Sequence, residues 1–473
     1  MLAIEKAEEL GTPPERIFVG QFSLSKNVDP PIPGYLSQPI ADHYLHYCPS
    51  LDLLTLTDKT GAKRGCVVGI ALDAKGKHLV GQVEITGQEG QSVPDALEEM
   101  ISTWTGRYAV FMDTRSDLRI YTDAVGEMGV VFDTRTGIVG STLPVVLNRA
   151  IEERPDLSNE AIMASRGHYA LGYTRDLFCE RLFPNHRLSL KTLEQSRFWP
   201  RDDAELTEAM QMSEDDITDE LIGILRRNTL GFMLAKASVF PLSGGQDSRI
   251  LISSARDHLD MSSIIFGMHH NWASGQDCDI GAQVAARLGL NYWRITAPKL
   301  KRWGQRAFDA RVGWATASGG KRSLRHTQRL PGGHLVIRGN VMGLTRASDW
   351  GRAGKAKAWD NARFGKKRLL LGDAISDGSV PVDMDSRYAS WRDSLPGDVK
   401  LRAHDFSFCE NYLPNSLGAR NYAYVNVTHV NPFASRRAIM ITSSLAPDIR
   451  REGAINRAIL EKIAPDLRDI PLI

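Results

Sequence analysis

The residues Ser243-Gly244-Gly245-Gln246-Asp247-Ser248 decide the fold that this sequence predicts. They follow the apolar run 239–242, which is typical of a buried parallel strand, with Pro241 at its end because proline cannot donate to a strand ladder. They precede residues 249–256, in which apolar side chains recur at helical spacing. The sequence therefore predicts a short glycine turn between the end of a strand and the start of a helix.

A turn of this kind suits a phosphate group. Gly244 and Gly245 place no Cβ between the backbone and a ligand, and the N–H groups at a helix start attract an anion. Ser243 and Ser248 add hydroxyl donors, whereas Asp247 would repel phosphate unless Mg²⁺ lay between them. The Gly-Lys-Ser/Thr ending of a Walker loop is missing. The plainer alternative is an ordinary glycine turn capped by serine.

The pattern Ser-Gly-Gly-x-Asp-Ser after a strand resembles the PP-loop of the ATP pyrophosphatases. Those enzymes cleave ATP between its α and β phosphates and form an adenylate and pyrophosphate. The resemblance implies that Leu242 and residues 243–248, Gln246 included, bind ATP and pyrophosphate. It also implies that Asp247 holds Mg²⁺ and takes part in catalysis.

Length, charge and cysteine content limit the class of protein. A chain of 473 residues predicts two or three domains, at ~150 residues per domain. The net charge of +2 lacks the basic excess that nucleic acid binding demands. Five scattered cysteines indicate reduced thiols and neither zinc nor disulfides. No run reaches the ~18 apolar residues of a membrane span, so we expect a cytoplasmic protein without membrane contact.

The first half of the chain has the pattern of antiparallel strands. Runs 66–72 and 78–83 are strand-like and flank a turn, and residues 94–105 predict a helix that begins near Ser92. Four further strand-like runs, each closed by a turn signal, cover residues 108–113, 118–123, 128–133 and 137–141. The turns at 114–117 and 134–137 join these runs in hairpins.

The stretches Gly106-Arg107-Tyr108-Ala109-Val110 and Thr122-Asp123-Ala124-Val125-Gly126 are similar to sheet motifs of the glutaminase domain in asparagine synthetases. The resemblance implies a four-layer α/β/β/α sandwich over residues 1–205, linker included. That family uses an N-terminal cysteine, exposed after removal of Met, as the nucleophile that attacks glutamine. Here position 2 is Leu2, and Cys48 and Cys66 come too late. We therefore expect a retained scaffold that does not hydrolyse glutamine.

The second half, residues 206–473, alternates strands with helices. Strand-like runs cover residues 263–267, 292–295 and 335–338, and a helical run covers 280–288. This alternation predicts an α/β domain whose parallel sheet binds ligands at the carboxyl ends of its strands. In asparagine synthetases the end of the second strand binds adenine. The resemblance implies that Phe266 and Gly267, beside Leu242, would bind adenine here. The alternative for Phe266 is plain core packing.

The second half departs from the asparagine synthetase pattern at two positions. The stretch 337–344 lies where the family has Ser-Gly-Glu-Gly-x-Asp-Glu, and Gly339 matches, but Gly343 replaces the second magnesium-binding Asp. Asp349 is the neighbour that could supply that carboxylate. No lysine follows the stretch Asn431-Pro432-Phe433, and Arg451 and Arg457 are the nearest cations that could act in catalysis.

These observations predict an ATP- and Mg²⁺-dependent ligase that joins a small-molecule or peptide carboxylate to an amine or ammonia through an acyl-adenylate. Two alternatives stay open within the resemblance: asparagine synthesis from ammonia, and a degenerate homologue that acts as a binding or scaffold protein. A nucleic-acid-modifying PP-loop enzyme is disfavoured by the neutral charge and the absence of paired cysteines. A homodimer is also left open.

Overall fold

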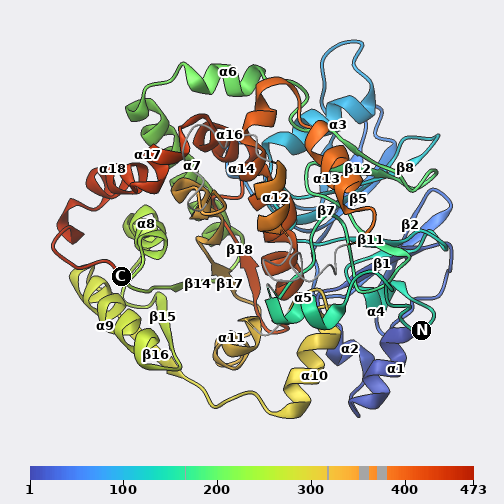
Figure 1. Cartoon of the computed structure of the whole chain (residues 1–473), viewed down its shortest axis with the longest axis horizontal. Coiled ribbons are helices and arrows are strands. Elements are labelled where there is room, and N and C mark those ends of the chain that lie inside the picture. The colour runs from blue at the N-terminus through green and yellow to red at the C-terminus, as the bar shows by residue number, and fades with distance from the viewer. Residues whose placement is uncertain (166, 317–318, 351–361, 370–380) are drawn as a thin grey trace.

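The computed structural model describes residues 1–165, 167–316, 319–350, 362–369 and 381–473. It contains three β-sheets, of which the first two form from the first two hundred residues and the third from the remainder of the chain (Figure 1). The fold is therefore mixed α/β, with one antiparallel sheet, one mostly antiparallel sheet and a separate parallel sheet.

The first sheet has six strands in the order β11-β9-β10-β1-β3-β2, all antiparallel. Its strands are β1 (Phe22–Ser25), β2 (Leu36–Ile40), β3 (His43–Tyr47), β9 (Val131–Asp133), β10 (Val139–Gly140) and β11 (Cys179–Arg181). The second sheet has seven strands in the order β13-β12-β8-β7-β5-β4-β6. Its strands are β4 (Leu53–Thr57), β5 (Lys63–Leu72), β6 (Gln82–Glu84), β7 (Thr105–Asp113), β8 (Leu118–Thr122), β12 (His186–Ser189) and β13 (Gln195–Arg197).

These two sheets pack face to face around a shared apolar core. Phe22 of β1 meets Phe111 of β7 edge-on, with ring centroids 5.6 Å apart. Helix α3 (Val93–Thr103) covers the outer face of the seven-stranded sheet, and Ser92 caps it as predicted by accepting the N–H of Asp95. Helix α4 (Leu143–Val146) covers the outer face of the six-stranded sheet.

The predicted turn between residues 66–72 and 78–83 is confirmed, because Leu72 and His78 form an antiparallel bridge and the N–H of Leu79 donates to the carbonyl of Ala71 at 2.9 Å. The second run is a strand only at its end, where β6 pairs in parallel with β4. Strand β5 pairs with β4 from Lys63 to Val68 and with β7 from Gly65 to Leu72, which leaves one of its edges open near Leu72. The predicted pairings of 108–113 with 118–123 and of 128–133 with 137–141 are confirmed as the antiparallel pairs β7–β8 and β9–β10.

The third sheet has five parallel strands in the order β16-β15-β14-β17-β18. Its strands are β14 (Ser238–Pro241), β15 (Ile264–His269), β16 (Tyr292–Thr296), β17 (Leu335–Ile337) and β18 (Thr428–Val430). The first four match the predicted runs, and Pro241 ends β14 as expected. From β14 the chain proceeds outward through β15 and β16 and then returns to the opposite side, so the strand order reverses between β14 and β17.

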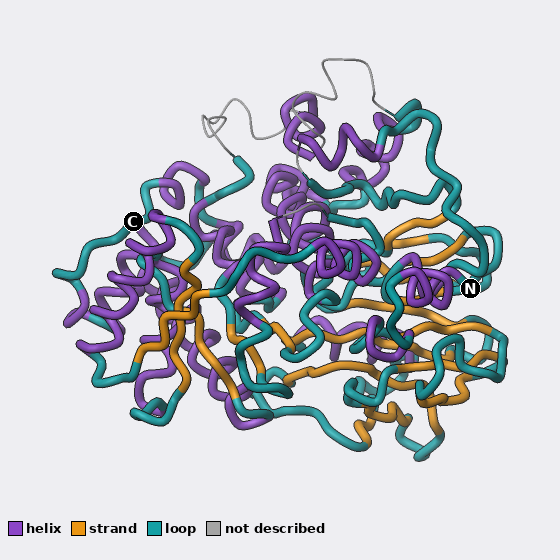
Figure 2. The backbone as a smooth tube through the Cα atoms, turned by 90° about the horizontal axis from the view of Figure 1, so that it is seen from below, coloured by secondary structure: helices purple, strands orange, loops and turns teal. Residues whose placement is uncertain are grey.

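Helices cover both faces of the parallel sheet (Figure 2). Because side chains alternate along a strand, those of one strand pack on different helices on the two faces. Phe240 and Leu335 face the core that includes α7 (Glu214–Ala235), α8 (Gln246–Ala255) and α9 (Trp272–Arg287). Val239 and Val336 face the opposite core, which includes α10 (Arg302–Arg311) and α11 (Gly319–Thr327). The remaining helices are α1 (Leu2–Glu9), α2 (Pro14–Ile17), α5 (Asn159–Ser165), α6 (Ala204–Met210), α12 (Ala362–Leu369), α13 (Met384–Asp393), α14 (Ala403–Ser407), α15 (Ala419–Asn421), α16 (Arg436–Ser444), α17 (Pro447–Arg451) and α18 (Ala454–Ile463).

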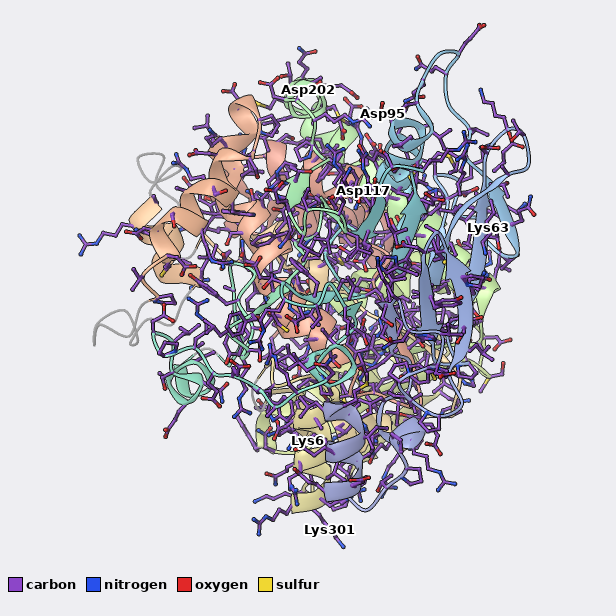
Figure 3. The ribbon with its side chains drawn as sticks, turned by 90° about the vertical axis from the view of Figure 1, so that its right-hand side faces the viewer. Lys6, Lys63, Asp95, Asp117, Asp202 and Lys301 are labelled. Atoms are coloured by element: carbon purple, nitrogen blue, oxygen red, sulfur yellow. The ribbon has the colours of Figure 1, made fainter. Side chains whose placement is uncertain are left out.

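The first half of the chain contacts the second at several points, including α10 and the seven-stranded sheet. Lys6 on α1 and Lys301 beside α10 lie at the same end of the molecule (Figure 3), where Trp303 Nε1 donates to the carbonyl of Leu10 at 2.9 Å. On the seven-stranded sheet, the buried Arg436 donates to Asn185 Oδ1 at 2.8 Å and to the carbonyl of Ile101 at 2.6 Å. Within the described residues, no helix combines the length and apolar character needed to cross a bilayer.

Candidate nucleotide site

A cleft of about 320 Å³ lies at the carboxyl ends of β14, β15 and β17. This is the point where the strand order reverses, and open parallel sheets bind ligands there because the connections diverge to opposite faces. The cleft is lined by Pro241, Leu242, Ser243, Gly245, Asp247, Ser248, Leu251, Phe266, Gly267, Met268, His270, Ser274, Asp277, Cys278, Arg338, Gly339 and Asn340.

The glycine turn is held in shape by its own hydroxyl groups. Ser248 Oγ accepts the N–H of Ser243 at 3.1 Å, and Ser243 Oγ accepts the N–H of Gly245 at 3.3 Å. Helix α8 begins at Gln246, and no described side chain caps it. The first N–H groups of a helix have no partner within the helix, so an anion in the cleft could accept them.

Gly244 lies between two other segments of the chain. Its N–H donates to Asp277 Oδ1 at 3.1 Å, and its carbonyl accepts the N–H of Ile473 at 3.2 Å. A Cβ at this position would lie 2.6 Å from Ile473 Cγ1, so a larger residue does not fit. Gly244 is therefore the one member of the turn whose N–H is already used by a carboxylate, and it does not line the cleft.

Asp247, the predicted metal ligand and catalytic residue, forms a two-point ion pair with Arg346. Arg346 Nη1 donates to Asp247 Oδ1 at 2.7 Å, and Nη2 donates to Oδ2 at 2.9 Å. Burial raises the pKa of the Asp247 carboxyl, and the charge of Arg346 opposes that rise. The second predicted metal ligand, Asp349, accepts Arg368 Nη2 at 3.1 Å and Ser407 Oγ at 3.4 Å.

Binding of Mg²⁺ by Asp247 and Asp349 stays a prediction, but the donor set as arranged does not fit that ion. Both oxygens of Asp247 accept guanidinium N–H groups, and both oxygens of Asp349 also accept hydrogen bonds. Among the residues that the structure describes, no group of three or more His, Cys, Asp or Glu side chains is placed to hold a metal.

The residues predicted to hold adenine do border the cleft. Tyr292 Oη donates to the carbonyl of Leu242 at 3.0 Å and lies where a side chain at Gly267 would stand, 1.9 Å from its Cβ position. Phe266 is fully buried in the core that includes α10, so its side chain packs in the interior and only the segment around it borders the cleft. Gly339 contacts Asp247, because a Cβ there would lie 3.0 Å from Asp247 Cβ.

Besides Gly244 and Asp349, three more predicted site residues lie outside the lining of the cleft. Gln246 Oε1 accepts Asn456 Nδ2 at 3.0 Å and so faces α18. Arg451 reaches Asp448 at 3.4 Å on the partly exposed surface of α17. Arg457 donates to the carbonyl of Glu452 and lines a separate, mainly apolar groove beside Leu460. The structure therefore does not bring Arg451 or Arg457 to the cleft.

Sequence reasoning missed several groups that the fold brings to the cleft. Arg338 and Asn340 flank the predicted Gly339 at the end of β17, and their position beside it was the signal that could have identified them. Asp277 comes from α9, which begins at Trp272, earlier than the predicted helix. Arg346 contacts Asp247 of the turn although the two residues are 99 positions apart, and no local sequence pattern predicts that contact.

A second cavity of about 420 Å³ adjoins the cleft and shares Asn340 with it. Arg346, Arg368 and Arg420 line it, together with Phe408 and Tyr412, whose rings stack 5.5 Å apart. The buried Nε of Arg420 has no hydrogen-bond partner among the described residues. A cavity with this lining suits a ligand that carries a carboxylate and an apolar portion.

The first half of the chain has no activated thiol at position 2, 48 or 66. Leu2 is buried in α1, and Cys48 and Cys66 are both buried. Burial raises the pKa of the Cys66 thiol to about 12, which keeps it protonated and a poor nucleophile at neutral pH. No protein-family model matches the chain, and no curated protein is significantly similar to it.

Proposed function

We propose that the protein is an ATP-dependent ligase that forms an amide bond through an acyl-adenylate and does not use glutamine. The observation that carries the proposal is the position of the Ser243–Ser248 turn, which opens onto a cleft at the reversal point of a parallel sheet. Ligand pockets have volumes of roughly 300–1,000 Å³, and the 320 Å³ cleft lies at the lower end of that range.

The proposed fold assignment follows the same resemblance. Residues 1–205 would form a glutaminase-like α/β/β/α sandwich with its linker, and residues 206–473 a PP-loop domain of the asparagine synthetase type. The packing of the two first sheets with helices outside them supports the sandwich. The buried cysteines support its role as a scaffold without glutaminase chemistry.

The proposed reaction has two steps. A carboxylate oxygen of the substrate attacks the α-phosphorus of ATP, the bond to the bridging oxygen breaks, and pyrophosphate leaves. An amine or ammonia then attacks the acyl carbon and displaces AMP. We place the pyrophosphate at the turn and the start of α8, and the substrate carboxylate in the adjoining cavity beside Arg420. Rate in such transfers depends on positioning and on charge stabilisation.

ATP–pyrophosphate exchange tests this function. We expect exchange that depends on one acid from a panel of carboxylates, and a loss of about a hundredfold or more in Asp247→Asn, because that carboxylate positions the Arg346 guanidinium against the turn. Asp58→Asn is the matched control, since Asp58 also pairs with an arginine, Arg64, but far from the cleft. Asparagine formation from aspartate and ammonia would identify the narrower activity.

A second candidate function is nucleotide binding without adenylation. It is favoured by the two ion pairs that engage Asp247 and Asp349, the carboxylates on which metal-assisted chemistry would depend. Nucleotide binding together with no exchange for any acid would support it. Absence of both binding and exchange would contradict the ligase and leave only a scaffold.

A further inference from the structure

The charged side chains around the turn are not arranged to bind magnesium. Arg346 is the last residue of the 3₁₀ segment Asn340–Arg346, and it reaches Asp247 with both of its terminal nitrogens. The side chain of Arg346 is 41% exposed and that of Asp247 is 21% exposed, so the pair lies at the cavity wall rather than in the core.

Arg346 and a magnesium ion would compete for the same carboxylate. Magnesium requires near-ideal octahedral coordination at about 2.0–2.1 Å from oxygen. A cation at that distance from Asp247 would lie close to a guanidinium group whose nitrogens are 2.7 and 2.9 Å from the two carboxylate oxygens. Like charges at such separations repel strongly, so Asp247 can hold one of the two cations at a time.

Position 343 cannot supply the missing second carboxylate. A Cβ built at Gly343 would lie 2.9 Å from Phe408 Cζ and 3.2 Å from Ser348 Oγ, so an aspartate there would not fit without movement of the phenyl ring. Phe408 and Ser348 therefore occupy the space that an acidic side chain at position 343 would need.

A second arginine lines the cleft without a carboxylate partner. Arg338 contacts the Nδ1 atom of His429 at 3.3 Å, and no described acidic side chain forms a salt bridge with it. Burial lowers the pKa of His429 well below its ordinary value, so the imidazole is neutral and adds no positive charge beside Arg338. Arg338 and Arg346 therefore place two guanidinium groups near the turn.

We propose that this site binds the polyphosphate end of its ligand without magnesium, with Arg346 and Arg338 supplying the positive charge. The inference rests on the proposed function, because the ligand is the pyrophosphate portion of ATP. Arginine suits this role, since its planar fork donates to two oxygens at once and stays charged.

Isothermal titration with inorganic pyrophosphate, in EDTA and in excess magnesium, tests the inference. We expect wild-type dissociation constants that agree within about threefold between the two conditions. In Arg346→Ala we expect binding in EDTA to weaken by at least about tenfold, as for a lost charge-assisted hydrogen bond. Magnesium should restore part of that loss, because Asp247 is then released to hold the metal.

Two further variants separate a binding defect from a folding defect. Arg346→Lys keeps the charge beside Asp247 and should bind in EDTA more tightly than Arg346→Ala. Arg306→Ala removes a comparable exposed arginine, paired with Glu9 at 3.2 Å, and should match the wild type. The double variant Asp247→Asn with Arg346→Ala leaves no unpaired charge, so weak binding in EDTA by a folded double variant supports the inference.

The outcomes distinguish failure of the inference from failure of the proposed function. Pyrophosphate binding by the wild type only in magnesium would overturn the inference and leave the nucleotide site intact. Binding in neither condition would overturn both. Equal binding in EDTA by wild type and Arg346→Ala would show that Arg346 does not supply the charge.

Discussion

At the scale of single residues, Asp277 controls whether the turn can accept an anion at Gly244. Its Oδ1 atom accepts the Gly244 N–H at 3.1 Å, the bond that a phosphate oxygen would make in its place. The carboxylate also lines the cleft and adds a negative charge where a polyphosphate would lie. A bound phosphate must therefore displace Asp277 or bind beside an unfavourable charge.

This contact predicts that Asp277→Ala binds pyrophosphate more tightly than the wild type. We expect a gain of about tenfold, because the variant removes a repulsive charge and leaves the Gly244 N–H available, together worth on the order of 1.4 kcal/mol. The measurement is a pyrophosphate titration at constant ionic strength. Asp279→Ala is the control, since Asp279 lies on the same helix but pairs with Arg294 outside the cleft. Weaker binding by Asp277→Ala would mean that this carboxylate holds the turn in its binding shape.

The sequence allowed part of the site to be predicted at this scale. The turn residues, Gly267 and Gly339 could be placed because each lies in or shortly after a strand that the apolar pattern reveals. The partners of the carboxylates could not be placed, since Arg346 and Arg368 come from segments with no strand pattern and meet their acids only in the folded chain. Charge type and local spacing carry no information about such contacts.

At the scale of elements, the buried Arg249 of α8 fixes residues 467–473 against the turn. Its Nη1 atom donates to the carbonyl of Ile470 at 2.8 Å and its Nη2 atom to that of Pro471 at 2.8 Å. Ile473 then donates to the carbonyl of Gly244. The helix that starts at the glycine turn thus also holds the segment that covers Gly244.

Arg249→Met is therefore predicted to destabilise the protein and to release this segment. We expect a loss of about 2–4 kcal/mol in the free energy of unfolding, from several hydrogen bonds to a charged group that is 2% exposed. Urea denaturation measures the loss, and hydrogen exchange at Ile473 reports the release. Arg256→Met, which removes a 33% exposed arginine paired with Asp466, should cost about 1 kcal/mol or less. Equal stability and exchange in the two variants would contradict this role for Arg249.

The elements that could be predicted from the sequence are those with a strong local period. Strands β14, β15, β16 and β17 follow from short apolar runs, and α3 follows from its cap at Ser92. Strand β6 is shorter than the predicted run 78–83 and pairs with β4, because β4 and β7 already pair with most of β5. Strand β18 was missed because only Val430 of its three residues is apolar, so it forms no apolar run.

At the scale of the whole molecule, Glu127 lies buried where the antiparallel sheets meet the second half of the chain. One carboxylate oxygen accepts Asn431 Nδ2, and the other, Oε2, has no hydrogen-bond partner among the described residues. Asp123, which accepts the N–H groups of Glu127 and Met128, adds a second buried carboxyl. Burial, reinforced by the charge of Asp123, raises the pKa of Glu127 well above its ordinary value of 4.5.

The raised pKa sets the sign of a pH effect on stability. Above pH 4.5 the unfolded chain releases the Glu127 proton while the native protein retains it, so the native state binds more protons. The contribution of Glu127 to the free energy of unfolding therefore falls as pH rises from 4.5 toward the raised native pKa. It is largest below the unfolded pKa, where both states are protonated.

Glu127→Gln is predicted to remove this loss, because glutamine can still accept from Asn431 and carries no proton to release. Relative to the wild type, the variant should gain up to about 1.4 kcal/mol per pH unit within that window and little below it. Urea denaturation at a series of pH values provides the measurement, with Glu8→Gln on the exposed face of α1 as the control. Parallel stability curves for wild type and Glu127→Gln would mean that Glu127 is ionised in the native protein, and that Arg107 and Arg338 compensate its charge across the contact between the two halves.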